Sequence, residues 1–279
     1  MKVTQDTRLI GRFYNVPNGR GLNIYNPYFE AASVDAIYLL FSNPDPKPLF
    51  QAMRDLNMAG AIPAAFEKDP ALASLVDRLT GTAKKLGRVS FVKNNHGKLI
   101  GYYAASKGLS DSLNEMCDIK DKDIVIMGAG NVVRGLLSEW KVANVWPKSV
   151  TIYNRGQAKL DLLKSEYPNI TTLSLVDLPS ASGNVFINAT PIGSPWHKDA
   201  DYNFTDEFLS KFKFIADVTF VPLAPPLIQS AQRLGLTYSP GWKMFLYQGR
   251  FALETILDIE VDTAKLAEIL VDDFATNWQ

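Results

Sequence analysis

Residues 123–140, DIVIMGAGNVVRGLLSEW, contain the pattern on which the predicted fold depends. The apolar run 124–127 predicts a buried strand, and residues 132–140 predict the helix that follows it. Between them, Gly128 permits a tight turn, and Gly130 lets the backbone approach an anionic group at the positive end of the helix. Val133 replaces the third glycine of G-x-G-x-x-G, but Gly135 follows and permits close helix–strand packing. This order predicts a dinucleotide-binding loop, with a plain tight turn as the alternative.

The same alternation of strands and helices continues toward the C-terminus. Strands are predicted at 149–153, 184–188, 214–218 and 237–238, and helices at 157–166, 206–210 and 226–234. Strands that alternate with helices form a parallel sheet with helices on both faces. The second half of the chain is therefore predicted to be an α/β domain with a Rossmann-type, doubly wound parallel sheet.

The end of the second strand in this series indicates which dinucleotide the loop binds. An acidic residue at this place, about 20 residues beyond the glycines, would bind the ribose hydroxyls of NAD. Here the strand ends in Asn154 and Arg155, and Lys159 follows. A guanidinium binds phosphate through two parallel hydrogen bonds, so NADP is the predicted cofactor and NAD is less favoured. The alternative is that Arg155 and Lys159 are solvated surface charges.

The first half of the chain also alternates between strands and helices. Strands are predicted at 35–41 and 60–65, and helices at 48–57, 71–86 and 106–115. Residues 89–92 and 98–103 flank the turn sequence NNHG and predict a hairpin. A polar stretch at 118–123 marks a domain boundary, and two helices at 243–257 and 263–271 end the chain. A second α/β domain is therefore expected before the Rossmann domain.

Composition and charge exclude several classes of protein. Of the 279 residues 47% are apolar, and 29 basic residues balance 29 acidic ones. A nucleic-acid-binding protein usually has a basic excess, so no nucleic acid is expected as a partner. No apolar run approaches the ~20 residues of a membrane span and no signal-peptide pattern is present, so no membrane is expected. The lone Cys117 fits a reducing, cytoplasmic location, and neither His96 nor His197 has a second ligand at metal-binding spacing, so no metal is expected.

Four segments of the second half resemble one known family. They are GAGNVVRG at 128–135, YNR at 153–155, NATPIG at 188–193, and ADV at 216–218 followed by PLAPPL at 222–227. In this order the segments resemble the shikimate dehydrogenase family. The resemblance covers nearly the whole chain, strongly after residue 120 and loosely before it.

The resemblance implies an organisation and an activity for the whole chain. It places a substrate domain at 1–118, an NADP-binding Rossmann domain at 119–242, and C-terminal helices at 243–279 that return to the first domain. It implies hydride transfer between NADP(H) and the hydroxyl or keto group of a small cyclic or hydroxy acid of the shikimate type, in a cleft between domains. A monomer or a homodimer is expected, with the small acidic substrate as its partner.

The predicted cofactor-binding residues come from the glycine loop, the strand ends and the family segments. They are Gly128, Ala129, Gly130, Asn131, Val132, Asn154, Arg155, Lys159, Asn188, Ala189, Thr190, Gly193, Val218 and Gly241.

The chain departs from the family at the residues implied to transfer protons. Glu67 stands where the family has a lysine, and Ala105 stands where it has an aspartate. Hydride transfer from a secondary alcohol needs a group that takes the hydroxyl proton. Lys68, Tyr103 and Lys107 are the predicted catalytic substitutes, with Lys107 lowering the pKa of Tyr103. The alternatives are solvated lysines and a tyrosine half-buried in a strand.

The substrate-binding residues are predicted from three segments. The loop NVPNGRG at 15–21 replaces the family's Ser-x-Ser signature, and Asn18 and Arg20 in it are predicted to bind substrate, Arg20 through the carboxylate. Ser90 begins the pair that replaces the family's Asn-Thr. Gln248 falls where the family has a substrate-contacting glutamine. Exposed, solvated side chains are the alternative for Arg20 and Gln248.

The replaced catalytic pair leaves a second interpretation of the function open. With Glu67 and Ala105 in these positions, the chain is alternatively a catalytically silent NADP-binding protein of the same fold. A purely structural module is less favoured because the phosphate-binding loop is intact.

Overall fold

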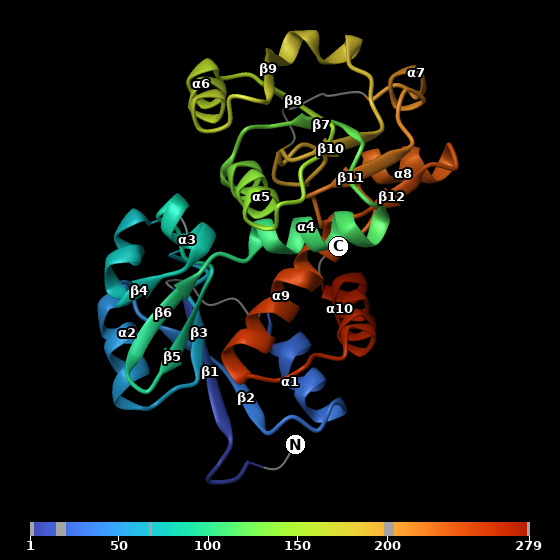
Figure 1. The fold of residues 1–279 in the computed structure, drawn as a ribbon. Helices are drawn as coiled ribbons and strands as arrows, with labels where there is room; N and C mark the ends of the chain where they lie inside the picture. Colours follow the sequence, from blue (N-terminus) through green and yellow to red (C-terminus); the bar gives the residue numbers. More distant parts are fainter. Residues whose placement is uncertain (1–2, 15–20, 67–68, 198–203, 278–279) are drawn as a thin grey trace. The chain divides into compact units, whose positions relative to one another are not determined.

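The chain forms two compact units, each built on a six-stranded sheet (Figure 1). The computed structural model describes residues 3–14, 21–66, 69–197 and 204–277. Unit 1 contains Met1–Ala105 and Gln248–Asp273, and unit 2 contains Ser106–Tyr247 and Phe274–Gln279. Across the described residues, no helix combines the length and apolar character that crossing a bilayer requires.

The sheet of unit 2 is entirely parallel, as the sequence predicts. Its strands are β7 (Asp123–Met127), β8 (Ser149–Asn154), β9 (Thr171–Ser174), β10 (Val185–Asn188), β11 (Phe214–Asp217) and β12 (Thr237–Ser239). They lie in the order β12-β11-β10-β7-β8-β9, and every neighbouring pair is parallel. The chain runs outward from β7 to β9, returns to β10 beside β7, and runs outward again. This order is that of the Rossmann fold, so the predicted fold class is confirmed.

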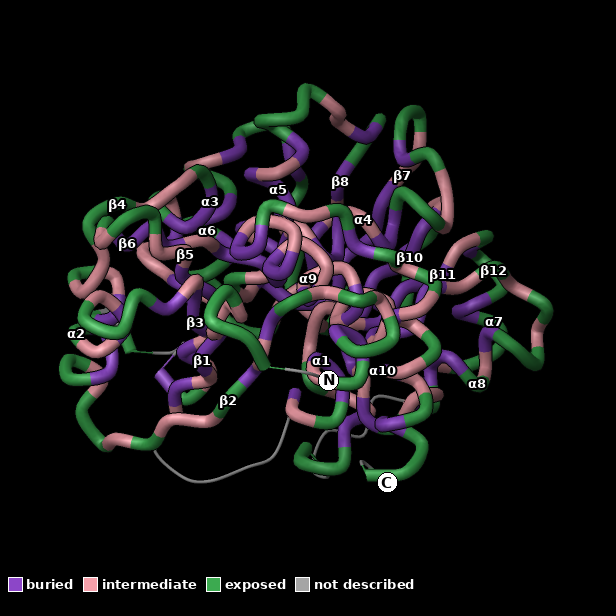
Figure 2. The backbone as a smooth tube through the Cα atoms, turned by 90° about the horizontal axis from the view of Figure 1, so that it is seen from below, coloured by how far each residue is buried: buried purple, intermediate pink, exposed green. Residues whose placement is uncertain are grey.

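Helices cover both faces of this sheet. They are α4 (Ala105–Met116), α5 (Asn131–Val142), α6 (Gln157–Glu166), α7 (Asp206–Leu209) and α8 (Pro226–Arg233), with a 3₁₀ helix at Leu175–Ser180. Alternate residues of a strand point to opposite faces. Ile124 and Ile126 of β7 accordingly pack in the cluster that contains α5 and α6, whereas Val125 and Met127 pack with α7 and α8. The central strands β7 and β10 are therefore buried almost throughout (Figure 2).

The sheet of unit 1 is mixed. Its strands are β1 (Arg8–Tyr14), β2 (Ala36–Ser42), β3 (Gly60–Ile62), β4 (Arg78–Leu79), β5 (Phe91–Asn95) and β6 (Lys98–Tyr102), and its helices include α1 (Leu22–Ala31), α2 (Pro46–Asp55) and α3 (Gly81–Leu86). The order is β2-β1-β3-β5-β6-β4. Strands β2, β1 and β3 are parallel to one another, and β5 and β6 form the predicted antiparallel hairpin. The hairpin turns at His96 and Gly97, both at positive φ, as a type I′ turn requires.

The C-terminal helices α9 (Gly241–Leu257) and α10 (Thr263–Asn277) contribute to unit 1, as predicted. The Tyr28 hydroxyl of α1 accepts a hydrogen bond from the Asp262 amide at 3.0 Å, just before α10. Lys265 of α10 donates to the Ala31 carbonyl at 2.9 Å. At the end of α9, Arg8 of β1 donates to the carbonyls of Ile256 and Leu257. These bonds hold the returning helices against α1 and β1.

Besides the 3₁₀ helix Leu175–Ser180 and the segment 70–86, the sequence did not predict β1, α1 and β9, and each of these three has a local reason. The strand β1 carries Arg8, Gly11 and Arg12, which interrupt the apolar pattern of RLIGRFY. The helix α1 contains Pro27, a residue that normally breaks a helix interior. The edge strand β9, TTLS, is mostly exposed, so its sequence lacks the apolar pattern of a buried strand.

The single helix predicted at 71–86 is wrong. The segment instead forms a 3₁₀ helix (Pro70–Leu75), the edge strand β4 and the short helix α3. The segment pairs with the edge of the sheet. The Asp77 amide donates to the Leu99 carbonyl at 2.9 Å, and the Leu99 amide donates to the Asp77 carboxylate at 2.7 Å. Gly81 then adopts φ +42°, which an α-helix does not allow. Apolar Leu72 still enters the core, so the periodicity identified buried residues correctly and the element incorrectly.

Gly81→Ala distinguishes this arrangement from a continuous helix. Nothing lies within 4 Å of a Cβ atom at position 81, so the substitution acts through the left-handed backbone alone. We expect it to destabilise the protein by roughly 1 kcal/mol, measured by chemical denaturation. In a continuous helix the same change would stabilise it by about as much, and that sign would contradict the structure. Lys84→Ala, at an exposed position of α3, is the control and should have little effect.

Candidate functional site

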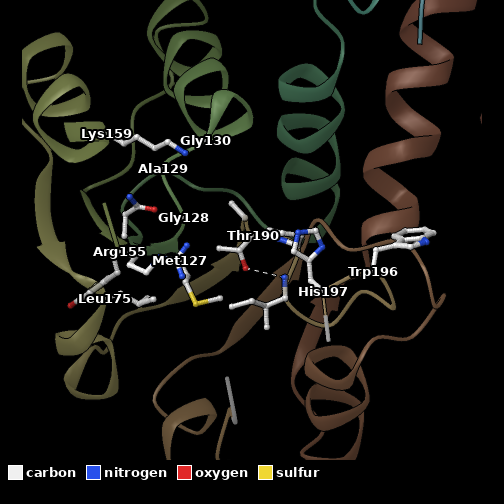
Figure 3. A pocket seen from close by; sticks show the side chains of 15 residues that line it. Met127, Gly128, Ala129, Gly130, Arg155, Lys159, Leu175, Thr190, Trp196 and His197 are labelled. Carbon is white, nitrogen blue, oxygen red and sulfur yellow. Dashed lines mark hydrogen bonds between the residues drawn. The ribbon is translucent and has the colours of Figure 1, made fainter. Parts of the chain in front are cut away.

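A cavity of about 670 Å³ opens at the carboxyl ends of β9, β8, β7 and β10 in unit 2 (Figure 3). This volume lies within the range of small-molecule sites. Its lining residues are Met127, Gly128, Ala129, Gly130, Tyr153, Asn154, Arg155, Lys159, Leu175, Ala189, Thr190, Pro191, Ile192, Trp196 and His197. The cavity lies where the strand order reverses beside β7, which is where open α/β sheets bind ligands.

Gly128 fixes the floor of the cavity. It adopts φ +110°, and a Cβ atom at this position would lie 2.8 Å from the Ala189 carbonyl oxygen. Its amide donates to the Tyr153 carbonyl at 2.7 Å, and the Ala189 amide donates to the Met127 carbonyl at 2.8 Å. The ends of β7, β8 and β10 are thereby held together, and only glycine fits at their meeting point.

Gly130 differs from Gly128 because nothing in the protein requires a glycine there. Its φ of −85° suits any residue, and no atom lies within 4 Å of where its Cβ atom would be. The open space belongs to the cavity, and Gly130 immediately precedes the twelve-residue helix α5. The amides at a helix N-terminus attract anions. A ligand that brings a pyrophosphate against the backbone would explain this glycine.

The charged side chains of the lining are basic. Arg155 and Lys159 lie on one side of the cavity, with His197 and Trp196 on the other and Thr190 between them (Figure 3). Among the described residues that line it there is no aspartate or glutamate. Asn154 ends β8 and its carboxamide donates to the Gly156 carbonyl at 2.8 Å, which shapes the turn that carries Arg155. The site is therefore suited to an elongated ligand with several anionic groups.

A buried polar network supports the loop after β10. The carboxamide of Asn188 donates to Asp217 at 3.0 Å and to the Ile192 carbonyl at 3.1 Å. Its oxygen accepts from the Thr190 amide at 3.1 Å and the Thr190 hydroxyl at 2.7 Å. The Thr219 amide donates to the same Asp217 oxygen at 2.9 Å. The network links the ends of β10 and β11 and sets the position of Thr190 in the cavity wall.

Asp217 is the titratable group of this network. Only 2% of its surface is exposed, and its second carboxyl oxygen has no hydrogen-bond partner among the described residues. Burial raises the pKa of Asp217 to about 7, against the opposing effect of hydrogen bonds from Thr219 and Asn188. Both protonation states are therefore populated near neutral pH. The sequence did not identify Asp217 as a site residue; its place at the carboxyl end of a buried strand is the signal that was available.

The structure brings eight of the predicted cofactor-binding residues to the cavity. These are Gly128, Ala129, Gly130, Asn154, Arg155, Lys159, Ala189 and Thr190. The lining does not include Asn131, Val132, Asn188, Gly193, Val218 or Gly241. Asn188 lies beneath the wall, as described above. At position 241 a Cβ atom would lie 2.3 Å from the Thr219 carbonyl oxygen, so Gly241 allows α9 to begin against the backbone that follows β11.

Seven residues of the lining were not predicted. They are Met127, Tyr153, Leu175, Pro191, Ile192, Trp196 and His197. Met127 and Tyr153 lie at strand ends, where the general rule for parallel sheets would have found them. Leu175 follows β9, a strand that the sequence did not reveal. Trp196 and His197 lie beyond the family segment at 188–193 and carry no motif.

The predicted catalytic and substrate residues are placed in different parts of the chain. Tyr103 is buried after β6 with 6% exposure, and Lys107 of α4 forms an ion pair with Asp111. Ser90 precedes β5, and its amide donates to the Tyr102 carbonyl at 2.7 Å. Gln248 lies half-exposed on α9.

Three other predicted residues, Asn18, Arg20 and Lys68, lie outside the described residues. Within the described ranges, no three histidine, cysteine or acidic side chains gather in a way that suits a metal ion. The catalytic and substrate assignments therefore stay predictions.

No model of a known protein family matches the chain. Curated relatives nevertheless match most of it. The shikimate dehydrogenase (NADP(+)) of Lysinibacillus sphaericus is 29% identical over 242 residues, which are 83% of this chain and 85% of that protein. The enzyme of the same name from Chlorobium phaeovibrioides is 27% identical over 263 residues, 88% of this chain and 89% of that one.

Solved structures share the fold along nearly the whole chain. The shikimate 5-dehydrogenase-like protein HI0607 has a TM-score of 0.84 at 19% identity, covering 96% of this chain and 98% of that one. Shikimate 5-dehydrogenase from Listeria monocytogenes, in complex with shikimate and NAD, has a TM-score of 0.82 at 24% identity, covering 97% and 98%. The 5-ketofructose reductase of Gluconobacter sp. strain CHM43 has a TM-score of 0.81 at 24% identity, covering 97% and 100%.

Gly130→Ala tests whether the space beside Gly130 belongs to a ligand. The thermal midpoint of the free protein should stay unchanged or rise slightly, because the backbone angle is ordinary and the space is open. The dissociation constant for NADPH should rise by about tenfold, since an extra methyl group costs 1–3 kcal/mol in a filled site. Gly235→Ala is the converse control: its φ of +67° predicts lost stability with unchanged NADPH affinity. Unchanged affinity of Gly130→Ala would contradict the assignment.

Asp217→Asn tests the buried carboxyl through its pH dependence. The folded-state pKa of about 7 lies above the unfolded value near 4, so Asp217 costs the protein stability as pH rises from about 4 to 7. The asparagine variant lacks this loss. Its free energy of unfolding relative to wild type should therefore rise by roughly 2–3 kcal/mol between pH 5 and pH 8.

The exposed Asp206 provides the control for this measurement, because Arg233 holds its pKa below the ordinary value. Asp206→Asn should show a constant difference from wild type between pH 5 and pH 8. Parallel pH profiles of Asp217→Asn and wild type would show that Asp217 is ionised at the same pH in the folded and unfolded chain.

Proposed function

Because the chain is a relative of the shikimate dehydrogenases, we propose that it is an NADP-dependent oxidoreductase. It moves hydride between NADP(H) and the hydroxyl or keto group of a small cyclic or hydroxy acid. The observation that carries this proposal is the cavity at the β7 switch point, with a glycine loop on one wall, two basic side chains at one end and no carboxylate in the described lining.

Different residues of unit 2 bind different parts of the dinucleotide. Gly128 and Gly130 let the backbone amides at the start of α5 approach the pyrophosphate. Arg155, which follows β8 and lines the cavity, binds the 2′-phosphate in this proposal, with Lys159 adding positive charge. An acidic residue at this place would repel that phosphate and favour NAD. When bound, the nicotinamide ring accepts or supplies the hydride.

The proton that accompanies hydride transfer needs an acceptor in unit 1. Ala105 cannot take it, because an alanine side chain has no titratable group. Tyr103, two residues earlier and directly after β6, is the candidate among the described residues. Lys107 already pairs with Asp111, so its action on Tyr103 requires that pair to open.

A second candidate function is a catalytically silent NADP-binding protein, and Ala105 is the observation that favours it. NADPH oxidation with a panel of cyclic and open-chain keto acids separates the two candidates when combined with thermal shifts. Turnover with any member, lost in Tyr103→Phe, supports the oxidoreductase. A rise in the thermal midpoint with NADPH and no turnover across the panel supports the silent protein.

Arg155→Ala tests the choice of dinucleotide. Removal of a charge-assisted hydrogen bond costs about 1.5–3 kcal/mol, so the affinity for NADPH should fall by roughly 10–100-fold. The affinity for NADH, which lacks the 2′-phosphate, should change by less than about twofold because no paired group is removed. Both are measured by calorimetry, with Lys148→Ala, an exposed lysine outside the cavity, as control. An equal fall for the two coenzymes would contradict the role given to Arg155.

A further inference from the structure

The cavity of unit 2 has two sides, and the strand order relates them to different halves of the coenzyme. Arg155 follows β8, whereas Trp196 and His197 lie in the segment that follows β10, and these two strands flank β7. A Rossmann sheet binds a dinucleotide across the strand at which the order reverses, with the adenosine ribose at the end of the next strand, here β8. The nicotinamide half therefore extends toward the side of β10, where Trp196 and His197 lie (Figure 3).

Trp196 is an exposed indole, which is unusual for a side chain that is highly buried on average. Trp140 is 2% exposed and Trp146 and Trp242 are half-buried, whereas 59% of the surface of Trp196 is exposed. Leaving an apolar ring of this size in water costs free energy that burial would recover. The exposed ring lines the cavity, so a ligand that fills the cavity can cover it.

Two consecutive turns hold Trp196 at the cavity wall. The Ser194 amide donates to the Pro191 carbonyl at 3.1 Å, and the His197 amide donates to the Ser194 carbonyl at the same distance. The second turn has Pro195 and Trp196 at its centre, and a proline at the first central position fixes the backbone angle that such a turn needs. The backbone that carries the indole is thus fixed by hydrogen bonds and by the proline ring.

The buried network beneath the cavity wall anchors the first of these turns. The Ile192 carbonyl accepts hydrogen bonds from the Asn188 carboxamide at 3.1 Å and from the Thr219 hydroxyl at 3.2 Å. Ile192 lies inside the first turn, so the ends of β10 and β11 set the position of the segment that carries Trp196. An incoming ring therefore meets a preformed surface, which reduces the entropy that binding costs.

The charges of the lining favour an aromatic contact for the oxidised coenzyme. The nicotinamide ring of NADP⁺ carries a positive charge, whereas that of NADPH is neutral. Arg155 and Lys159 are basic, and the described part of the lining contains no aspartate or glutamate that could attract a cation. The face of an indole attracts a cation more strongly than the other aromatic side chains do. Trp196 therefore suits a planar cation.

We propose that Trp196 stacks on the nicotinamide ring of the coenzyme, and that this contact favours the oxidised form over the reduced one. The proposal rests on the proposed function and adds to it a residue that sets the preference between the two redox states. A ring whose one face lies on the indole keeps its other face for hydride transfer to or from the substrate. Trp196 is then a binding residue for the part of the coenzyme that reacts.

Calorimetry with three ligands that differ at the nicotinamide tests the contact. They are NADP⁺, NADPH and 2′,5′-ADP, which has the adenosine 2′-phosphate but no nicotinamide. In Trp196→Leu the affinity for NADP⁺ should fall by roughly tenfold, the size of a stacking contact with one base. The loss for NADPH should be roughly two- to fivefold smaller, because the neutral ring lacks the cation–π attraction. The affinity for 2′,5′-ADP should stay unchanged.

Two further variants separate the indole from the fold. Trp196→Phe keeps an aromatic face and should retain most of the affinity for NADP⁺ that Trp196→Leu loses. Trp146→Phe changes a tryptophan outside the described lining of the cavity and should leave all three affinities unchanged. Saturating NADP⁺ should quench a larger fraction of the tryptophan fluorescence in Trp146→Phe than in Trp196→Phe, because the second variant lacks the indole that the coenzyme covers. Since Trp196 is exposed, neither change at position 196 should lower the thermal midpoint of the free protein.

Three results in Trp196→Leu would overturn the proposal. Equal losses of affinity for NADP⁺ and 2′,5′-ADP would mean that the indole contacts the adenosine half. Equal losses for NADP⁺ and NADPH would mean that it does not distinguish the redox states, and an unchanged affinity for NADP⁺ would mean that it does not bind the coenzyme. Failure of the proposed function would look different, because the wild type itself would then bind none of the three ligands.

Discussion

The contact between Gly128 and the Ala189 carbonyl is the constraint on which the rest of unit 2 depends. It brings the ends of β7 and β10 so close that a Cβ atom at position 128 would lie 2.8 Å from that oxygen. Gly128 and Ala189 both line the cavity. The amides at the start of α5 lie beside it, where they attract an anionic ligand. The buried Asn188 and Asp217 hold the facing loop from below, so the wall that carries Thr190 has a fixed shape.

The sheets of both units share one topological feature, a strand at which the order of strands reverses. In unit 1 β1 lies between β2 and β3, and in unit 2 β7 lies between β8 and β10. In open α/β sheets ligands bind beyond the carboxyl end of such a strand. Beyond β7 in unit 2 lie backbone amides together with Arg155 and Lys159, which suit a polyanion.

The sequence predicted unit 2 well because its signals are local. The apolar strand at 124–127, the glycine turn and the following helix lie within 18 consecutive residues, and their chemistry is the same in any Rossmann sheet. Unit 1 was harder to predict, since β1 carries charges that its neighbours in space satisfy, such as the carbonyls that accept from Arg8. The segment 71–86 was misassigned because its strand β4 forms only by pairing with β6, which comes later in the chain. Trp196 lies beyond the family segment at 188–193, and no short motif records its place in the lining of the cavity.

A crystal structure of the protein soaked with NADP⁺ tests the central claim most directly. The account predicts pyrophosphate oxygens on the amides that follow Gly128 and Gly130, and the adenosine phosphate paired with the Arg155 guanidinium. Electron density for the coenzyme elsewhere, or a cavity that stays empty at saturating NADP⁺ in crystals whose β7–β10 edge is open to solvent, would contradict it.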